Sequence, residues 1–221
     1  PIIQVSGRTF PVDIIYRPLK QLSQDEVENI EDAVLSSIND LPPGNKGDVL
    51  IFLPGERDIH DIKKFLNDQL KNKFEILPLF SRLPVKEQQK IFKQGTTRRI
   101  ILTTNIAETS LTVPGIKYVI DAGLARIVRY NPRLKIEQLL IEKISQASAN
   151  QRSGRCGRIA PGVCIRLYDE EDFDLRPTFT DPEIMRTSLA SVILKMASLH
   201  LGPVHKFPFL QPPINKFIQD G

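Results

Sequence analysis

The sequence predicts an α/β fold with a mostly parallel β-sheet, and three observations support this prediction. Short apolar runs recur between residues 49 and 168, helical patterns separate them, and the runs themselves show no polar alternation. Strands that are buried on both faces lose that alternation, and strands separated by helices are joined by crossovers that keep them parallel. A chain of 221 residues is long enough for one such domain and part of a second.

The elements of this sheet follow in order along the chain. Ser23 and Glu26 form a capping box, which predicts a first helix over about residues 24–38. Residues 58–70 carry apolar side chains at helical spacing and predict a second helix. Pro84 suits the first turn of a third. Five apolar runs are the predicted strands, at residues 49–53, 74–79, 99–103, 116–120 and 163–168.

A predicted β-hairpin interrupts this alternation. Residues 126–130 and 134–141 flank Asn131-Pro132-Arg133 and alternate partly between apolar and polar side chains. Such a pattern around a short turn indicates two strands that project from the sheet.

The composition changes in the C-terminal quarter of the chain. We interpret the acidic run 169–174 as a linker. Thr180 and Glu183 then form a second capping box, which predicts an amphipathic helix up to about His200. We therefore divide the chain into a domain over residues 1–173 and the truncated start of another over residues 174–221.

The positive charge is concentrated in one segment. The whole chain has a net charge of +4, but residues 121–160 hold eight lysines and arginines against three acidic residues. Such clustering is expected for a surface that binds phosphate or nucleic acid. Taken alone, it fits a solvated basic face equally well.

Several classes of protein are excluded by composition. No apolar run approaches the roughly 18 residues of a membrane span, and the first residues lack the pattern of a signal peptide. Cys156 and Cys164, with three scattered histidines, form neither a disulfide framework nor a metal-binding pattern. We expect a cytoplasmic protein with no membrane contact and no metal site of its own, in which both cysteines serve packing.

The segment from Gln151 to Arg158, Gln-Arg-Ser-Gly-Arg-Cys-Gly-Arg, carries the clearest chemistry. On a continuous helix, Gln151, Arg155 and Arg158 would share one face, at about 0°, 40° and −20° around the axis. Two guanidiniums that keep their protons, with an amide beside them, suit a transferring phosphoryl group. The two glycines weaken a helix, which makes sense where something approaches the backbone closely. The alternative is an exposed basic helix.

This segment resembles motif VI, Q-R-x-G-R-x-G-R, of the superfamily 2 helicases of the DEAH-box group. Three further motifs follow in the family order: residues 50–55 resemble motif IV, residues 77–84 the motif after it, and residues 104–116 motif V almost letter for letter. The resemblance covers about residues 45–170. Residues 113–115 and 145–150 look most like the bacterial HrpA-type RNA helicases.

The resemblance implies a RecA-like fold of the P-loop NTPase type. Residues 1–173 would be the second RecA-like domain of such a helicase, and residues 174–221 the start of its winged-helix domain. The cofactors would be ATP and Mg²⁺, bound mainly by the first RecA-like domain, and the partner RNA, with DNA as the alternative. This chain has neither a G-x-x-x-x-G-K-[ST] loop nor a D-E-x-H tetrad, so alone it should hydrolyse no ATP. We expect a monomer.

The resemblance also implies residue roles. The catalytic residues would be Gln151, Arg155 and Arg158, with the arginines acting as fingers toward ATP. Nucleotide contacts are implied for these three and for Phe92, Thr109, Ser110 and Thr112. RNA contacts are implied for Gly55, Arg57, Ser81, Arg82, Thr104 and Asn105. As alternatives, Phe92 would be a helix core residue, and the polar residues would serve ordinary loop structure or helix capping.

One position departs from the family pattern. Pro114 stands where eukaryotic splicing relatives carry an aspartate that helps to hold the nucleotide, so that ribose contact is not carried over. The departure fits a relaxed choice of nucleotide.

Two functional hypotheses remain. The first is half of an ATP-driven RNA translocase. The second is a non-catalytic module that binds nucleic acid or a partner and has lost the ATPase. The intact Gln151, Arg155 and Arg158 favour the first, because RNA binding alone does not require them.

Overall fold

The computed structural model describes residues 10–22, 27–44, 47–71, 73–93, 95, 97–109 and 111–220. The chain forms two compact units, and each is described by itself. The first comprises Pro1–Ala125 and Lys143–Thr178, and the second comprises Arg126–Glu142 and Phe179–Gly221. The domain division at residue 173 stays a prediction.

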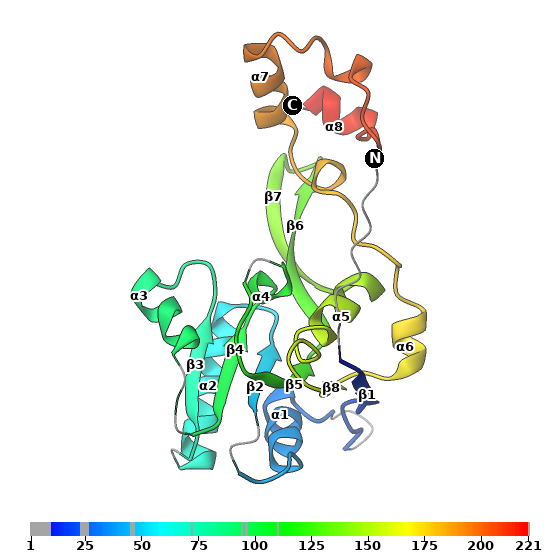
Figure 1. Cartoon of the computed structure of the whole chain (residues 1–221). Helices are drawn as coiled ribbons and strands as arrows, with labels where there is room; N and C mark the ends of the chain where they lie inside the picture. The colour runs from blue at the N-terminus through cyan, green and yellow to red at the C-terminus, as the bar shows by residue number, and fades with distance from the viewer. Residues whose placement is uncertain are drawn as a thin grey trace. The chain divides into compact units, whose positions relative to one another are not determined.

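The first unit is built on a six-stranded sheet in the order β1-β8-β5-β2-β4-β3, in which every neighbouring pair is parallel (Figure 1). The α/β class is therefore confirmed, and all five predicted runs are strands. The edge strand β1 was not predicted, because it is short and three of its five residues are exposed. The strands are β1 (Val12–Tyr16), β2 (Asp48–Phe52), β3 (Glu75–Leu79), β4 (Arg99–Thr103), β5 (Ile116–Asp121) and β8 (Gly162–Arg166).

Helices α1 (Ile30–Asn39) and α2 (Glu56–Leu70) pack on one face of this sheet. The apolar side of α2 is buried through Ile59, Ile62, Leu66 and Leu70, as its spacing predicts.

The predicted start of α1 is wrong. The helix begins at Ile30, where the side chain of Asn29 accepts a hydrogen bond of 2.8 Å from the backbone N–H of Asp32. The first turn of a helix leaves backbone N–H groups without a partner inside the helix, and the Asn29 side chain accepts from one of them. Asn29 therefore caps the helix and fixes its start at Ile30. The proposed capping box at Ser23 and Glu26 lies outside the described residues.

Short helical segments pack on the opposite face of the sheet. They place Ile91 and Ala107 against β-strand residues such as Phe52, and Val113 and Cys156 join the same cluster from the loops that follow α4 and α5. Pro84 precedes α3 directly, as predicted. Both cysteines are buried, and burial raises the pKa of the Cys156 thiol to about 12, which supports a packing role. The segments are α3 (Val85–Gln88), the 3₁₀ helix η1 (Gln89–Phe92), α4 (Ile106–Thr109) and α5 (Gln146–Ser153).

The acidic run that we interpreted as a linker is a helix, α6 (Glu170–Asp174). Asp169 caps it by accepting a hydrogen bond of 2.5 Å from the N–H of Asp172. The carboxylate of Asp172 pairs in turn with Arg176 and Lys143, so this side chain of the acidic run has defined partners in the first unit.

The predicted hairpin is formed by β6 (Leu124–Asn131) and β7 (Ile136–Lys143), and its residues Arg126–Glu142 belong to the second unit. The single helix predicted up to His200 is wrong, because the hairpin binds the backbone in the middle of that segment. The N–H of Tyr130 donates to the carbonyl of Arg186 at 2.7 Å, and Glu137 accepts from the N–H of Ser188 at 2.9 Å. The observed segments are η2 (Glu183–Met185), α7 (Ala190–Ser198), η3 (Val204–Lys206) and α8 (Asn215–Asp220).

Within the described part of the chain, no helix combines the length and the apolar character that crossing a membrane requires.

Candidate functional site

The carboxyl edge of the sheet collects the predicted RNA-binding residues. Because all six strands are parallel, their carboxyl ends meet at one edge. The neighbouring strands β2, β4 and β3 end there, and their loops are tied together: the N–H of Leu53 donates to the carbonyl of Thr103 at 2.8 Å. The N–H of Thr104 donates to the carbonyl of Leu79 at 3.3 Å. These loops carry Gly55 and Arg57, Ser81 and Arg82, and Thr104 and Asn105.

This edge presents hydrogen-bond donors to solvent. Arg57, Ser81, Arg82 and Asn105 are exposed, whereas Gly55 is buried directly before α2. The 15-residue helix α2 thus begins at this edge, and its first turn carries the acidic side chains of Glu56 and Asp58 on either side of Arg57.

The predicted common helix face of motif VI is wrong. Helix α5 ends at Ser153, and Gly154 caps it, so Arg155 and Arg158 follow in a turn rather than on the helix of Gln151. Gln151 is exposed on the last turn of α5. The structure therefore does not place these three side chains on one helix.

The two arginines instead contact the motif V loop. Nη1 of Arg155 donates to the carbonyl of Leu111 at 3.2 Å, and Nη1 of Arg158 donates to Oγ1 of Thr112 at 2.5 Å. Thr112 and Thr109 are exposed beside this contact, and Ser110 lies outside the described residues. Motifs V and VI thus form one surface through contacts between residues 44 and 46 positions apart in the sequence.

Neither of these arginines has a carboxylate partner among the residues that the structure describes. Arg155 is half-buried, and its Nε has no hydrogen-bond partner. Burial lowers the pKa of Arg155, and the positive charge of Arg158 lowers it further. The carboxylate of Glu108 opposes this shift without forming an ion pair with Arg155. Two neighbouring guanidiniums without an ion-paired carboxylate among the described residues make a site that favours an anion.

Arg152 is a buried residue of motif VI for which the sequence pattern predicts no role. Its side chain is fully buried, donates to Oδ1 of Asp121 at 2.7 Å and to Oε2 of Glu108 at 3.3 Å, and lies 4.8 Å from the centre of the Phe52 ring. Burial lowers the pKa of Arg152, but Asp121 and Glu108 raise it more, so the net shift is upward. Arg152 therefore joins motif VI to motif V. The sequence does contain one indication of this contact. Asp121 stands at the end of an apolar strand, and a carboxylate buried there needs a cationic or hydrogen-bonding partner.

Arg99 is a second missed residue, and it holds the segment that carries Phe92. Its guanidinium donates to the carbonyls of Ile91 and Lys93, on either side of Phe92, at 2.8 and 2.5 Å. It also donates to the carbonyl of Pro114 at 3.0 Å and pairs with the buried carboxylate of Asp48. One buried arginine thus fixes the turn of Phe92 relative to the motif V loop.

The side chain of Phe92 is 46% exposed, so the alternative role as a core residue is wrong. Its neighbour Ile91 supplies the buried contact instead. An exposed aromatic ring on a fixed turn is available to stack on a planar ligand.

The two glycines of motif VI have different roles. A Cβ on Gly157 would lie 2.7 Å from the carbonyl oxygen of Phe10 and 2.6 Å from Cγ2 of Val12. The close approach that we expected at a glycine is therefore made by the chain leading into β1. A Cβ on Gly154 would lie 3.4 Å from the nearest atom, the carbonyl oxygen of Asn150, which is an ordinary contact.

We therefore expect Gly157→Ala to lower the free energy of unfolding by about 1–3 kcal/mol, because overpacking forces the backbone apart. The matched control is Gly154→Ala. Gly154 has φ −62° and ψ −6°, which alanine adopts freely, so the change should be neutral or stabilise by about 0.4–1 kcal/mol. Urea unfolding of both variants checks the difference. Equal midpoints for the two would contradict the packing role of Gly157.

Comparisons with known proteins identify the family of this chain. Residues 31–160 match the family described as the helicase conserved C-terminal domain. Over 221 residues the chain is 55% identical to "ATP-dependent RNA helicase HrpA" of Escherichia coli (strain K12), covering all of this chain and 17% of that protein. It is 41% identical over 222 residues to "Probable ATP-dependent RNA helicase DHX35" of Homo sapiens, covering 96% of this chain and 31% of that protein.

The fold is also found in a crystal structure of the Escherichia coli DEAH/RHA helicase HrpB. The TM-score is 0.84 and the identity 31%, over 97% of this chain and 27% of that one. The expected RecA-like fold is thereby confirmed. The chain spans less than a third of the length of each of these proteins. It belongs to the helicase conserved C-terminal domain family, as the resemblance of its motifs to those of DEAH-box helicases implies.

Proposed function

We propose that this chain is the part of an ATP-dependent RNA helicase that completes the ATPase site and forms one side of the RNA groove. The observation that carries the proposal is the pair Arg155 and Arg158, which meet the motif V loop without a carboxylate partner among the described residues. The names of the HrpA and DHX35 relatives support ATP and RNA as the ligands.

The nucleotide side of this proposal uses the face of motifs V and VI. ATP held mainly by a preceding RecA-like domain would bring its phosphates to Arg155 and Arg158, which would balance the charge that develops during phosphoryl transfer. Gln151 would orient the attacking water, and Phe92 would stack on the adenine. Thr109, Ser110 and Thr112 would add contacts from the motif V loop.

Mg²⁺ is not assigned to residues of this chain. Among the described residues, no three His, Cys, Asp or Glu side chains are grouped so that they could hold a metal ion. We infer that the metal would be held with ATP by the preceding domain, where it would supply charge neutralisation on the phosphates.

The RNA side of the proposal uses the carboxyl edge of the sheet. Gly55, Arg57, Ser81, Arg82, Thr104 and Asn105 would contact the RNA backbone. Contacts with phosphates give binding that ignores sequence and weakens with salt. Thr104 follows β4 directly, and the residues of α4 lead on to the loop that Arg155 and Arg158 contact. A change at the nucleotide would thus reach the RNA contacts through motif V.

A monomeric state and a cytoplasmic location stay predictions, as do the roles of residues 1–173 and 174–221.

The chain alone is expected to hydrolyse no ATP, with or without RNA, because it contains no phosphate-binding loop of the Walker A type. A longer protein that includes the preceding domain should show RNA-stimulated turnover. Phosphate release assays on both preparations provide the test. Measurable RNA-stimulated turnover by the 221-residue chain would overturn the assignment.

A further inference from the structure

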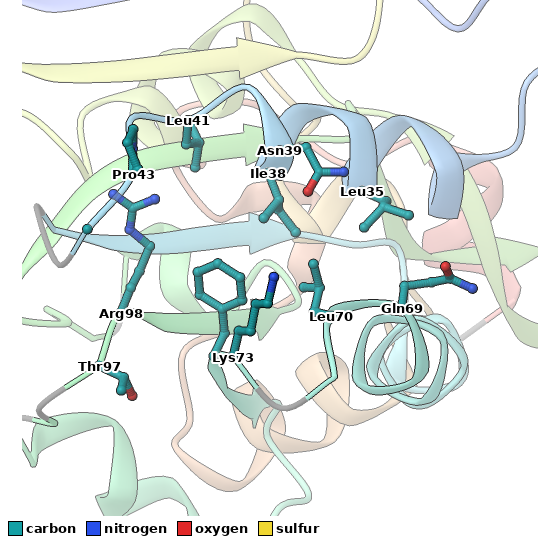
Figure 2. A pocket seen from close by; sticks show the side chains of 12 residues that line it. Leu35, Ile38, Asn39, Leu41, Pro43, Gln69, Leu70, Lys73, Thr97 and Arg98 are labelled. Carbon is teal, nitrogen blue, oxygen red and sulfur yellow. The ribbon is translucent and has the colours of Figure 1, made fainter.

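A second site lies at the opposite edge of the sheet from the helicase motifs. A hollow of about 640 Å³ opens there between the ends of α1 and α2 and the segments that lead into β2, β3 and β4 (Figure 2). All of these segments belong to the first unit. None of the residues assigned above to nucleotide or RNA lines this hollow.

One side of the hollow is apolar and the other is cationic. Leu35 and Ile38 of α1 and Leu70 of α2 contribute apolar side chains, and Phe74 adds an aromatic ring. Figure 2 shows the side chains of Lys73 and Arg98 on different segments along the hollow, with the head group of Arg98 beside Pro43 and that of Lys73 near Leu70.

Arg98 is buried without a counter-charge. Arg98 is only 5% exposed. Its Nε has no hydrogen-bond partner, and its Nη2 donates to the carbonyl of Pro42, a neutral acceptor, at 2.8 Å. No carboxylate lies within ion-pair distance among the described residues. The next residue, Arg99, is equally buried but pairs with Asp48. The guanidinium of Arg98 lies 5.2 Å from the centre of the Tyr118 ring, a contact that offsets part of the cost of burial. The ring carries no net negative charge, so an anion that enters the hollow would stabilise the guanidinium further.

The sequence of the surrounding segments points the same way. Residues 43–47, 71–74 and 93–98 contain five lysines or arginines and no acidic residue. Among the described residues that line the hollow, Lys73 and Arg98 are cationic and none is acidic.

We propose that this hollow binds a small amphipathic carboxylate. The carboxylate pairs with Arg98 and Lys73, and the apolar part packs against Leu35, Ile38 and Leu70. A free organic acid and the C-terminal carboxylate of a short peptide with an apolar last residue share this chemistry. RNA does not fit it, because the walls offer apolar surface in place of further cationic side chains. The proposal is independent of the ATPase and RNA roles of the chain.

Isothermal titration of the full chain with octanoate, and with the peptide acetyl-Gly-Leu-Phe bearing a free carboxylate, tests the proposal. At least one of them should bind with one molecule per chain, and the one that binds identifies the source of the carboxylate. Octanol and the amidated peptide, which lack the charge, should bind at least about tenfold more weakly, as expected for the loss of a charge-assisted hydrogen bond. Failure of both carboxylates to bind, or equal binding of the uncharged analogues, would overturn the proposal.

Variants locate the site. Arg98→Gln should weaken binding of the carboxylate by about tenfold or more. Lys73→Gln provides a second test at an exposed position where the fold is preserved, with a smaller loss in the same direction. Lys64→Gln, on the exposed side of α2, is the matched control and should leave binding unchanged. Unchanged binding in the folded Lys73 and Arg98 variants, or displacement of the carboxylate by oligouridine, would contradict the site.

Discussion

Arg155→Ala and Arg158→Ala, introduced into the longer helicase, are each expected to lower RNA-stimulated ATP turnover by about 10³-fold, the effect that finger arginines typically have. Both guanidiniums lie on the motif V loop without a carboxylate partner among the described residues, so their charge is available to a phosphate. Alanine removes that charge together with one hydrogen bond to the motif V loop. RNA affinity should change little, because the RNA contacts are proposed for loops at the carboxyl edge of the sheet.

Turnover and RNA affinity are therefore measured on the same preparations. Arg17→Ala is the matched control, because Arg17 pairs with Asp40 on the α1 side of the sheet and takes no part in the motif V contact. Arg158→Lys separates charge from geometry: lysine keeps the charge but loses the planar fork, so turnover should recover only in part. Unchanged turnover in both alanine variants would instead favour a module that binds nucleic acid without hydrolysing ATP.

The sheet could be predicted because its strands are continuous apolar runs. Such runs are buried on both faces, which implies parallel strands, and parallel strands bring their following loops to one edge. This reasoning predicts that Gly55, Ser81 and Thr104, which follow three of the strands, lie near one another at that edge. The edge strand β1 could not be found in the same way, because half-exposed residues such as Ile14 and Ile15 occupy its centre.

The arrangement of motif VI could not be predicted from helical periodicity. A helical wheel places Arg155 and Arg158 with Gln151, but the helix ends at Ser153. The chain turns there so that Gly157 can accept a hydrogen bond of 2.8 Å from the N–H of Phe10, next to the strand that was missed. The motif identifies Gln151, Arg155 and Arg158 as residues of interest, but tertiary packing decides how their side chains are arranged.

The buried ion pairs of the site also could not be predicted from local sequence patterns. Asp48 pairs with Arg99 across 51 positions of sequence, and Asp121 pairs with Arg152 across 31. A periodicity argument treats each of these residues as a polar interruption, whereas in the folded chain they are the contacts that join the motifs.

Arg152→Met is expected to give the largest loss of stability, because it leaves two buried carboxylates without their cation. Removing one partner of a buried ion pair typically lowers the free energy of unfolding by about 3–5 kcal/mol, out of a total of about 5–15 kcal/mol for a native domain. Arg152 has two such partners, and the side chain of Asp121 is itself fully buried. Urea unfolding followed by far-ultraviolet circular dichroism measures the loss.

Two further variants distinguish the missing charge from the missing volume. Arg17→Met removes an arginine from the more exposed ion pair with Asp40, so it should lower the free energy of unfolding by about 1 kcal/mol or less. Combining Arg152→Met with Glu108→Gln and Asp121→Asn removes the uncompensated carboxylates, so the triple variant should unfold at a higher urea concentration than Arg152→Met alone. If the triple variant were no more stable than the single one, the side-chain volume of Arg152 and its contact with Phe52 would account for its role. The charge network between motifs V and VI would then have no part in holding the site together.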